Sequence, residues 1–127
     1  MIKKIIVKKT VESIVKEMEA KAKSYGFGLL KAYEFNTLLQ EKGFPINRKI
    51  AVFELCNPAG AQAALESYPE ISVYLPCRIS VYEEENNTIL STIGLDDVVG
   101  NSEGLTDEFR SLMGEIYNRL LSLMSDW

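Results

Sequence analysis

The sequence predicts a single α+β domain over residues 1–127, with a mostly antiparallel sheet and helices packed on one side. Three observations lead to this prediction. Two apolar runs of strand length flank a short Ala-rich helix between residues 50 and 82. Residues 11–22 and 109–124 carry apolar side chains at helical spacing. A polar tip at residues 84–87 separates two further strand-like runs, as in a β-hairpin. The expected order is β-α-β, then further strands and a C-terminal helix.

The first two elements follow from charge placement and capping. Residues 2–9 predict an edge or near-edge strand, because four lysines bracket alternating apolar residues. Thr10 is the expected N-cap of the helix that follows, and Gly26 is expected to end it. The apolar stripe of this helix, which we assign to the core, consists of Val11, Ile14, Val15, Met18 and Ala22.

Residues 27–35 alternate like a second strand, and a short helix is expected over residues 36–42. If Leu30 and Ala32 face the core, Glu34 lies on their side and is a candidate general base or ligand. Alternatively, Glu34 lies at the strand end and reaches solvent, since an unpaired buried carboxylate is costly.

The central block begins with a strand and turns at once into a helix. Residues 50–55 form an apolar run that suits a largely buried strand. Asn57 is a good N-cap and Pro58 suits the first helical position, so a helix is expected from Pro58 to about Ser67. Cys56 is thereby placed at a helix N-terminus, where N–H groups and the helix dipole favour a thiolate.

Glu54 interrupts the apolar run and is a candidate catalytic residue. In an extended strand it points to the same side as Cys56, two residues later. A carboxylate beside a thiol raises the thiol pKa unless a cation intervenes, and Arg78 is the nearby cation in the sequence. The alternative places Glu54 on the solvent face of an edge strand.

Cys77 follows Pro76, which donates no hydrogen bond and belongs at a strand start, an edge or a bulge. Cys77 is therefore expected to open a strand. If the strands on either side of the helix are neighbours, Cys56 and Cys77 come close together. A disulfide between them would need Cα atoms within about 7 Å.

These residues carry a family resemblance. The segments Cys56-Asn57-Pro58 and Leu75 to Glu83, with the Ala-rich helix between them, resemble the core signature of the Domain of Unknown Function 302 family. The resemblance covers roughly residues 10–95 and is most specific over 52–83. It implies a small α/β domain, an antiparallel sheet with helices on one side, and homodimers, but no reaction. The two cysteines resemble a subgroup of the family.

The sequence departs from one common pattern of that family. An Asp-His pair often follows the strand after the first helix, whereas this chain has residues 32–36, AYEFN, and contains no histidine. Any role of that histidine therefore does not carry over.

The C-terminal third is expected to contain a loop and a long helix. Residues 94–104, rich in Gly and Asp, predict a loop, in which Asp96 and Asp97 are an option for a cation. Thr106 is expected to start the last helix, whose broad stripe either completes its own core or leaves apolar surface for a second subunit anchored by Trp127. The stripe consists of Phe109, Leu112, Met113, Ile116, Leu120, Leu123 and Met124, widened by Tyr117 and Leu121.

Composition limits the partners and the location. The net charge of −4 argues against nucleic-acid binding, although residues 1–49 carry 11 Lys or Arg against 5 Asp or Glu and residues 50–127 carry 3 against 13. The halves either neutralise each other or present opposite faces to a partner subunit. No run is long enough for a membrane span and no signal peptide is evident, so a cytoplasmic location is expected.

Two classes of function fit these observations. Without histidine there is no Ser-His-Asp triad and no His-ligated zinc, and no glycine-rich phosphate loop or other motif assigns a cofactor. The first class is a non-catalytic, homodimeric binding or interaction module for a small ligand or a sulfur-carrier protein. The second uses Cys56 and Cys77 for redox chemistry, sulfur transfer or a soft metal. The binding candidates are Asn57, Pro58, Pro76, Arg78 and Glu34.

Overall fold

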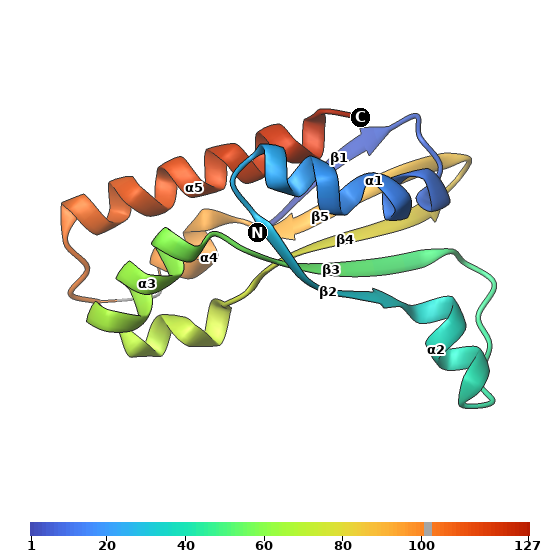
Figure 1. Ribbon diagram of the computed structural model, residues 1–127, viewed down its shortest axis with the longest axis horizontal. Coiled ribbons are helices and arrows are strands. Elements are labelled where there is room, and N and C mark those ends of the chain that lie inside the picture. The colour runs from blue at the N-terminus through green and yellow to red at the C-terminus, as the bar shows by residue number, and fades with distance from the viewer. Residues whose placement is uncertain (101–102) are drawn as a thin grey trace.

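Five strands form one antiparallel sheet in the order β1-β5-β4-β3-β2 (Figure 1). The computed structural model describes residues 1–100 and 103–127. The strands are β1 (Ile2–Val7), β2 (Gly28–Glu34), β3 (Ile50–Cys56), β4 (Cys77–Glu84) and β5 (Asn87–Ile93). The predicted α+β class and antiparallel sheet are confirmed.

The strand order assigns the edges of the sheet. The lysine-rich β1 is an edge strand, as its sequence predicts, and β2 is the other edge. Glu85 and Asn86 connect β4 to β5 with positive φ angles of 48° and 69°, the conformation of a tight hairpin turn. Glu54 lies on β3, an internal strand, so its expected place on an edge strand is wrong.

The two long helices, α1 (Val11–Ser24) and α5 (Asp107–Ser125), lie on the same side of the sheet in Figure 1. Both begin as predicted. Thr10 accepts a hydrogen bond from the backbone N–H of Ser13, and Thr106 accepts one from the N–H of Phe109, each at 3.1 Å. The shorter helices are α2 (Phe35–Glu41), α3 (Pro58–Ser67), the 3₁₀ helix η1 (Pro69–Tyr74) and α4 (Leu95–Val99).

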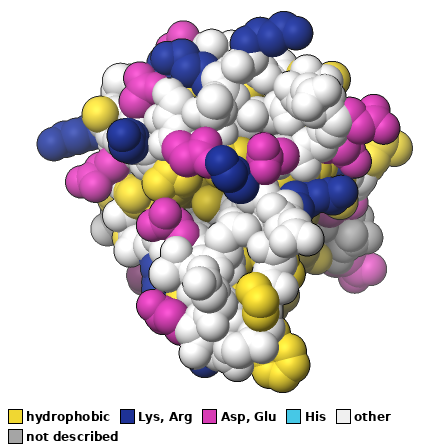
Figure 2. Space-filling view, turned by 90° about the vertical axis from the view of Figure 1, so that its right-hand side faces the viewer, with side chains coloured by type: hydrophobic (Ala, Val, Ile, Leu, Met, Phe, Trp, Pro, Cys, Tyr) yellow, Lys and Arg dark blue, Asp and Glu magenta, His cyan; other side chains and the backbone are white. Residues whose placement is uncertain are grey.

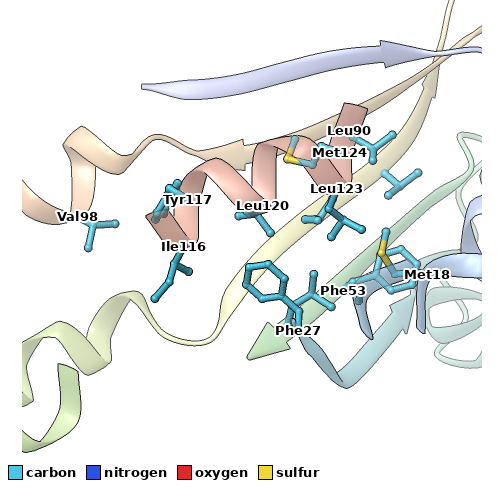
Figure 3. Close-up of a cluster of buried hydrophobic side chains, with 14 of the residues drawn as sticks. Met18, Phe27, Phe53, Leu90, Val98, Ile116, Tyr117, Leu120, Leu123 and Met124 are labelled. Atoms are coloured by element: carbon cyan, nitrogen blue, oxygen red, sulfur yellow. The ribbon is translucent and has the colours of Figure 1, made fainter. Parts of the chain in front are cut away.

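The hydrophobic core fills the space between the sheet and these two helices (Figure 3). Met18 of α1 is completely buried, as the spacing of its helix predicts. The stripe of α5 is buried against its own chain, and Trp127 packs against the same core with Lys21 Nζ 4.9 Å from its ring centroid. The structure thus favours the alternative in which the last helix completes its own core.

The opposite face of the sheet is left without a long helix. Alternation along β3 directs Phe53 and Leu55 into the core and Val52 and Glu54 toward this open face. The helix η1 borders one end of the open face through Tyr74.

One expectation for the C-terminal third needs correction. Part of residues 94–104 forms α4 rather than a loop, and residues 101–102 lie outside the described chain. Asp97 binds the N-terminal ammonium group of Met1. Among the described residues, no group of three metal-ligating side chains includes Asp96 and Asp97.

Folding brings the oppositely charged halves of the sequence together. The first half supplies Lys21 and the second supplies Asp126, and these side chains form an ion pair at 3.4 Å. On the face shown in Figure 2, positive and negative side chains are interspersed.

Gly60 is required where α3 meets α5. A Cβ atom at this position would lie 2.2 Å from Ile116 Cδ1 and 3.2 Å from Asn57 Oδ1. We expect Gly60→Ala to lower the free energy of unfolding by about 1–3 kcal/mol through overpacking, measured by urea denaturation.

Gly114→Ala in α5 is the matched control. An added Cβ would meet no described heavy atom within 4 Å, so this change should raise stability by roughly 0.5–1 kcal/mol through helix propensity. Equal effects of the two substitutions would contradict the packing argument.

Candidate functional site

Asn57 organises the end of the sheet at which both cysteines lie. As predicted, β3 ends at Cys56 and α3 begins at Pro58, with Asn57 Oδ1 accepting from the N–H of Gly60 at 2.9 Å. Its Nδ2 donates to the carbonyl of Gly26 at 3.1 Å. One side chain thus caps α3 and holds the turn between α1 and β2.

The two cysteines lie on neighbouring strands. Cys77 opens β4, as predicted, after a cis peptide bond between Leu75 and Pro76. In the register of β3 and β4, Leu55 is opposite Cys77, so Cys56 is one residue from the position directly opposite. Both cysteines are free and partly buried.

Cys56 and Cys77 are among the residues that line one cavity of about 290 Å³, which we call the cysteine pocket. Its lining consists of Leu30, Leu55, Cys56, Asn57, Gly60, Ala61, Leu65, Ser72, Leu75, Pro76, Cys77, Met113 and Ile116. Burial, and secondarily the electrostatic interaction with Cys56, raise the pKa of the Cys77 thiol to about 11. Cys77 is therefore protonated at neutral pH, which suits a buried thiol better than an ionised nucleophile.

Glu54 forms a polar cluster with two side chains on the open face. The hydroxyl of Tyr33 donates to Glu54 Oε1 at 2.6 Å, and Arg78 donates to Oε2 from Nε at 3.3 Å and from Nη2 at 3.2 Å. Glu54 is only 9% exposed, and the positive charge of Arg78 compensates its negative charge. The hydrogen bond from Tyr33, followed by that from Arg78, lowers the pKa of the Glu54 carboxyl group. The ionised Glu54 carboxylate accepts hydrogen bonds from both Tyr33 and Arg78 and so orients these side chains. Its lowered pKa makes it a weak general base.

Beside this cluster lies a larger cavity of about 520 Å³ on the open face, which we call the sheet groove. It is lined by Ile2, Tyr33, Phe35, Val52, Val73, Tyr74, Leu75, Pro76, Arg78, Ser80, Ser91, Thr92 and Ile93. The rings of Tyr33 and Phe35 are stacked with centroids 6.1 Å apart. Aromatic and aliphatic walls with a few polar groups are typical of small-molecule sites.

The structure divides the candidate residues between these cavities. Cys56, Asn57 and Cys77 line the cysteine pocket, Arg78 lines the sheet groove, and Pro76 lines both. Pro58 is exposed at the first position of α3 and lines neither cavity.

The structure decides between the alternatives for the two carboxylates. Glu54 lies near Arg78 but lines neither cavity, so it is not brought to the cysteine pocket. Glu34 pairs in register with Ala51 on the helix side of β2 but is exposed to solvent, as its alternative placement states. Glu34 is therefore not a carboxylate of the buried layer.

Sequence reasoning missed most polar residues of the sheet groove, among them Tyr33, Ser80 and Ser91. Each occupies an alternate strand position that faces away from the core. Alternation alone marks these faces. The strand order was needed to show that they adjoin one another.

Comparisons with known proteins support the fold. The family model described as Domain of unknown function DUF302 matches residues 3–126, a longer stretch than the motifs indicate. No curated protein matches the chain. A crystal structure of the uncharacterized conserved protein DUF302 from Bacillus stearothermophilus has a TM-score of 0.84 at 24% identity, covering 97% of this chain and 94% of that one. Within the described residues, no helix is long and apolar enough to cross a membrane.

The lowered pKa of Glu54 predicts a pH-dependent contribution to stability. A carboxyl group with a lowered folded-state pKa stabilises the fold above its ordinary pKa of 4.5, and this contribution is lost as the pH falls through the folded-state value. We expect Glu54→Gln to lower the melting temperature at neutral pH. The difference from the unsubstituted protein should shrink in acid, measured by calorimetry across pH.

Glu34→Gln makes the same chemical change on an exposed side chain of the neighbouring strand and is the control. A difference between the Glu54→Gln protein and the unsubstituted one that stays constant from neutral pH into acid would contradict the proposed role of the Glu54 charge.

Proposed function

The chain belongs to the DUF302 family, which assigns no reaction, and we propose that it is a non-catalytic binding module whose sheet groove holds a small molecule with an apolar body and an anionic group. The observation that carries this proposal is an exposed arginine, Arg78, in an otherwise largely apolar cavity. The volume of about 520 Å³ lies within the range of roughly 300–1,000 Å³ common for ligand pockets.

Arg78 has donors to spare for such a ligand. Its side chain is 66% exposed, and it donates two side-chain hydrogen bonds to Glu54. These bonds use two of the five guanidinium N–H groups. The remaining donors suit a carboxylate, sulfonate or phosphate, for which the planar guanidinium is well shaped.

The local charge also favours an anion. Lys31 Nζ lies 5.0 Å from the ring centroid of Tyr33, and its charge contributes to lowering the pKa of Glu54. The two positive charges of Arg78 and Lys31 thus outnumber the single negative charge of Glu54. The apolar body of the ligand would lie against Tyr33 and Phe35.

The remaining parts of this proposal concern location and the thiols. We propose a cytoplasmic location, which two free cysteines support because reducing compartments keep thiols unpaired. A second candidate function, based on Cys56 and Cys77, is favoured by one specific observation: both residues line the same cavity.

We expect the folded protein to bind 8-anilino-1-naphthalenesulfonate, a fluorescent probe with aromatic rings and a sulfonate, in the sheet groove. Arg78→Gln should weaken this binding about tenfold, the size of one charge-assisted hydrogen bond. Ser80→Trp, which fills the groove, should abolish it. Fluorescence titration measures both effects.

The controls separate the groove from general charge and from loss of folding. Lys23→Gln removes one positive charge from an exposed position of α1, outside the groove, and should leave the affinity unchanged. Glu54→Gln combined with Arg78→Gln restores the local net charge but not the guanidinium, so its affinity should stay low if Arg78 contacts the anion directly. Circular dichroism confirms that each variant is folded. Equal affinities of the Arg78→Gln and unsubstituted proteins would refute the proposed anion site.

We further propose that the chain forms a homodimer through exposed apolar side chains of β1 and β5 on the open face, of which Ile2 and Ile93 also line the sheet groove. Three isoleucines support this surface, because Ile2, Ile6 and Ile93 are 59%, 63% and 39% exposed. Ile6→Glu should shift the protein to monomers in sedimentation velocity, whereas Phe44→Glu, at a position 74% exposed, should not. A chain that sediments as a monomer at every concentration would rule out this dimer.

A further inference from the structure

We propose that the cysteine pocket is a binding site for a flat, uncharged aromatic molecule of the size of naphthalene. The pocket lies between α3, η1 and α5, at the end of β3 and the start of β4. In the fold, α3 packs against both η1 and α5 (Figure 1). The ligand is held by shape and apolar contact, without a bond to sulfur. The site is separate from the sheet groove, so this proposal and the proposed function can fail independently.

The first step concerns charge. The wall of the cysteine pocket consists of apolar and neutral polar residues, whereas the sheet groove contains Arg78. Cys77, which belongs to this wall, is protonated at neutral pH because burial raises its pKa to about 11. An ionised group that moves from water into such a cavity loses hydration and gains no opposite charge, which is costly. The cysteine pocket therefore selects an uncharged ligand.

The second step concerns hydrogen bonds. The side chain of Asn57 serves the protein itself, since Oδ1 accepts from the N–H of Gly60 at 2.9 Å and Nδ2 donates to the carbonyl of Gly26 at 3.1 Å. The N–H of Ala61 donates to the carbonyl of Asn57 at 2.9 Å. These polar groups of the wall already have partners within the chain. The ligand is therefore recognised by its shape and apolar surface rather than by its polar groups.

The third step concerns size and shape. An aliphatic cavity of about 150 Å³ is sufficient to bind benzene. The cysteine pocket has a volume of about 290 Å³, nearly twice as much, which suits a pair of fused aromatic rings. Met113 contributes to the wall, and methionine side chains adapt their shape and make favourable contacts with aromatic rings. A flat aromatic ligand therefore fits this wall better than a bulky aliphatic one.

The fourth step concerns access. Leu30 of β2 and Leu65 of α3 line the pocket but are 61% and 47% exposed, so they form an apolar rim where the pocket meets solvent. Leu55 and Ile116 belong to the same wall and are buried. An aromatic ring that passes the rim is therefore transferred from water to an apolar interior, which the hydrophobic effect favours.

The experiment uses two probes that share the same rings. 2-Acetylnaphthalene is uncharged, and 2-naphthoate carries a carboxylate in place of the acetyl group. We expect 2-acetylnaphthalene, added to the full-length protein at neutral pH, to shift the backbone amide signals of Gly60, Ala61 and Cys77 in two-dimensional NMR spectra. At these signals the affinity for 2-naphthoate should be at least about tenfold lower, because its carboxylate loses hydration without compensation.

Three variants test the site. Ala61→Phe fills the pocket from α3 and should abolish binding of 2-acetylnaphthalene. Gln62→Phe adds the same ring at the next residue, which is exposed and outside the lining, and should leave the affinity unchanged. Leu65→Lys places a cation at the exposed rim and should raise the affinity of the pocket for 2-naphthoate about threefold, the size of an exposed charge pair. Circular dichroism checks the fold, and Leu65→Lys decides if Ala61→Phe does not fold.

Three results would overturn the proposal. These are amide signals of Gly60, Ala61 and Cys77 that stay in place at saturating 2-acetylnaphthalene, equal affinities of the two probes at these signals, and a folded Ala61→Phe protein that binds as before. An affinity for 2-naphthoate that Leu65→Lys leaves unchanged would refute the charge argument. Failure of the sheet groove is read separately, from the binding of 8-anilino-1-naphthalenesulfonate to the Arg78→Gln protein.

Discussion

The antiparallel pairing of β3 with β4 places Glu54 opposite Arg78 and Leu55 opposite Cys77. Because side chains alternate between faces, a slip of one residue would turn each set to the wrong side of the sheet. The present register unites the Glu54 carboxylate with the Arg78 guanidinium on the open face and turns Cys77 to the core face with Leu55. Both candidate sites therefore depend on one pairing, and the buried side chains of Phe53 and Ile79 hold it from the core side.

Local chemistry in the sequence accounts for most of the elements. The caps at Thr10, Asn57 and Thr106 are short-range interactions, so residue type and spacing were sufficient to predict where α1, α3 and α5 begin. The same holds for the hairpin tip at Glu85 and Asn86. Strand order is different, because it depends on contacts between residues far apart in the chain. Without the strand order, an edge strand was a reasonable place for Glu54. The structure shows that β3 is internal.

The candidate sites were predictable to unequal degrees. Cys56 and Cys77 stand beside prolines at element ends, and that local signal led to the cysteine pocket. The sheet groove has no comparable motif. Tyr33 and Ser91 enter it from β2 and β5, which β3 and β4 separate in the sheet. A cavity assembled across strands is recognised after the strands have been ordered.

The last helix illustrates a related point, since its broad stripe had two reasonable partners and the structure assigns it to its own core.

Leu75 and Pro76 line both the sheet groove and the cysteine pocket, so the two cavities share one wall. A ligand that displaces this wall from one side changes the shape offered on the other. Thermodynamic linkage then requires that two such ligands alter each other's affinity by the same factor, whichever binds first. If a ligand in either cavity moves Leu75 and Pro76, the short segment between η1 and β4 therefore couples the occupancy of the two cavities.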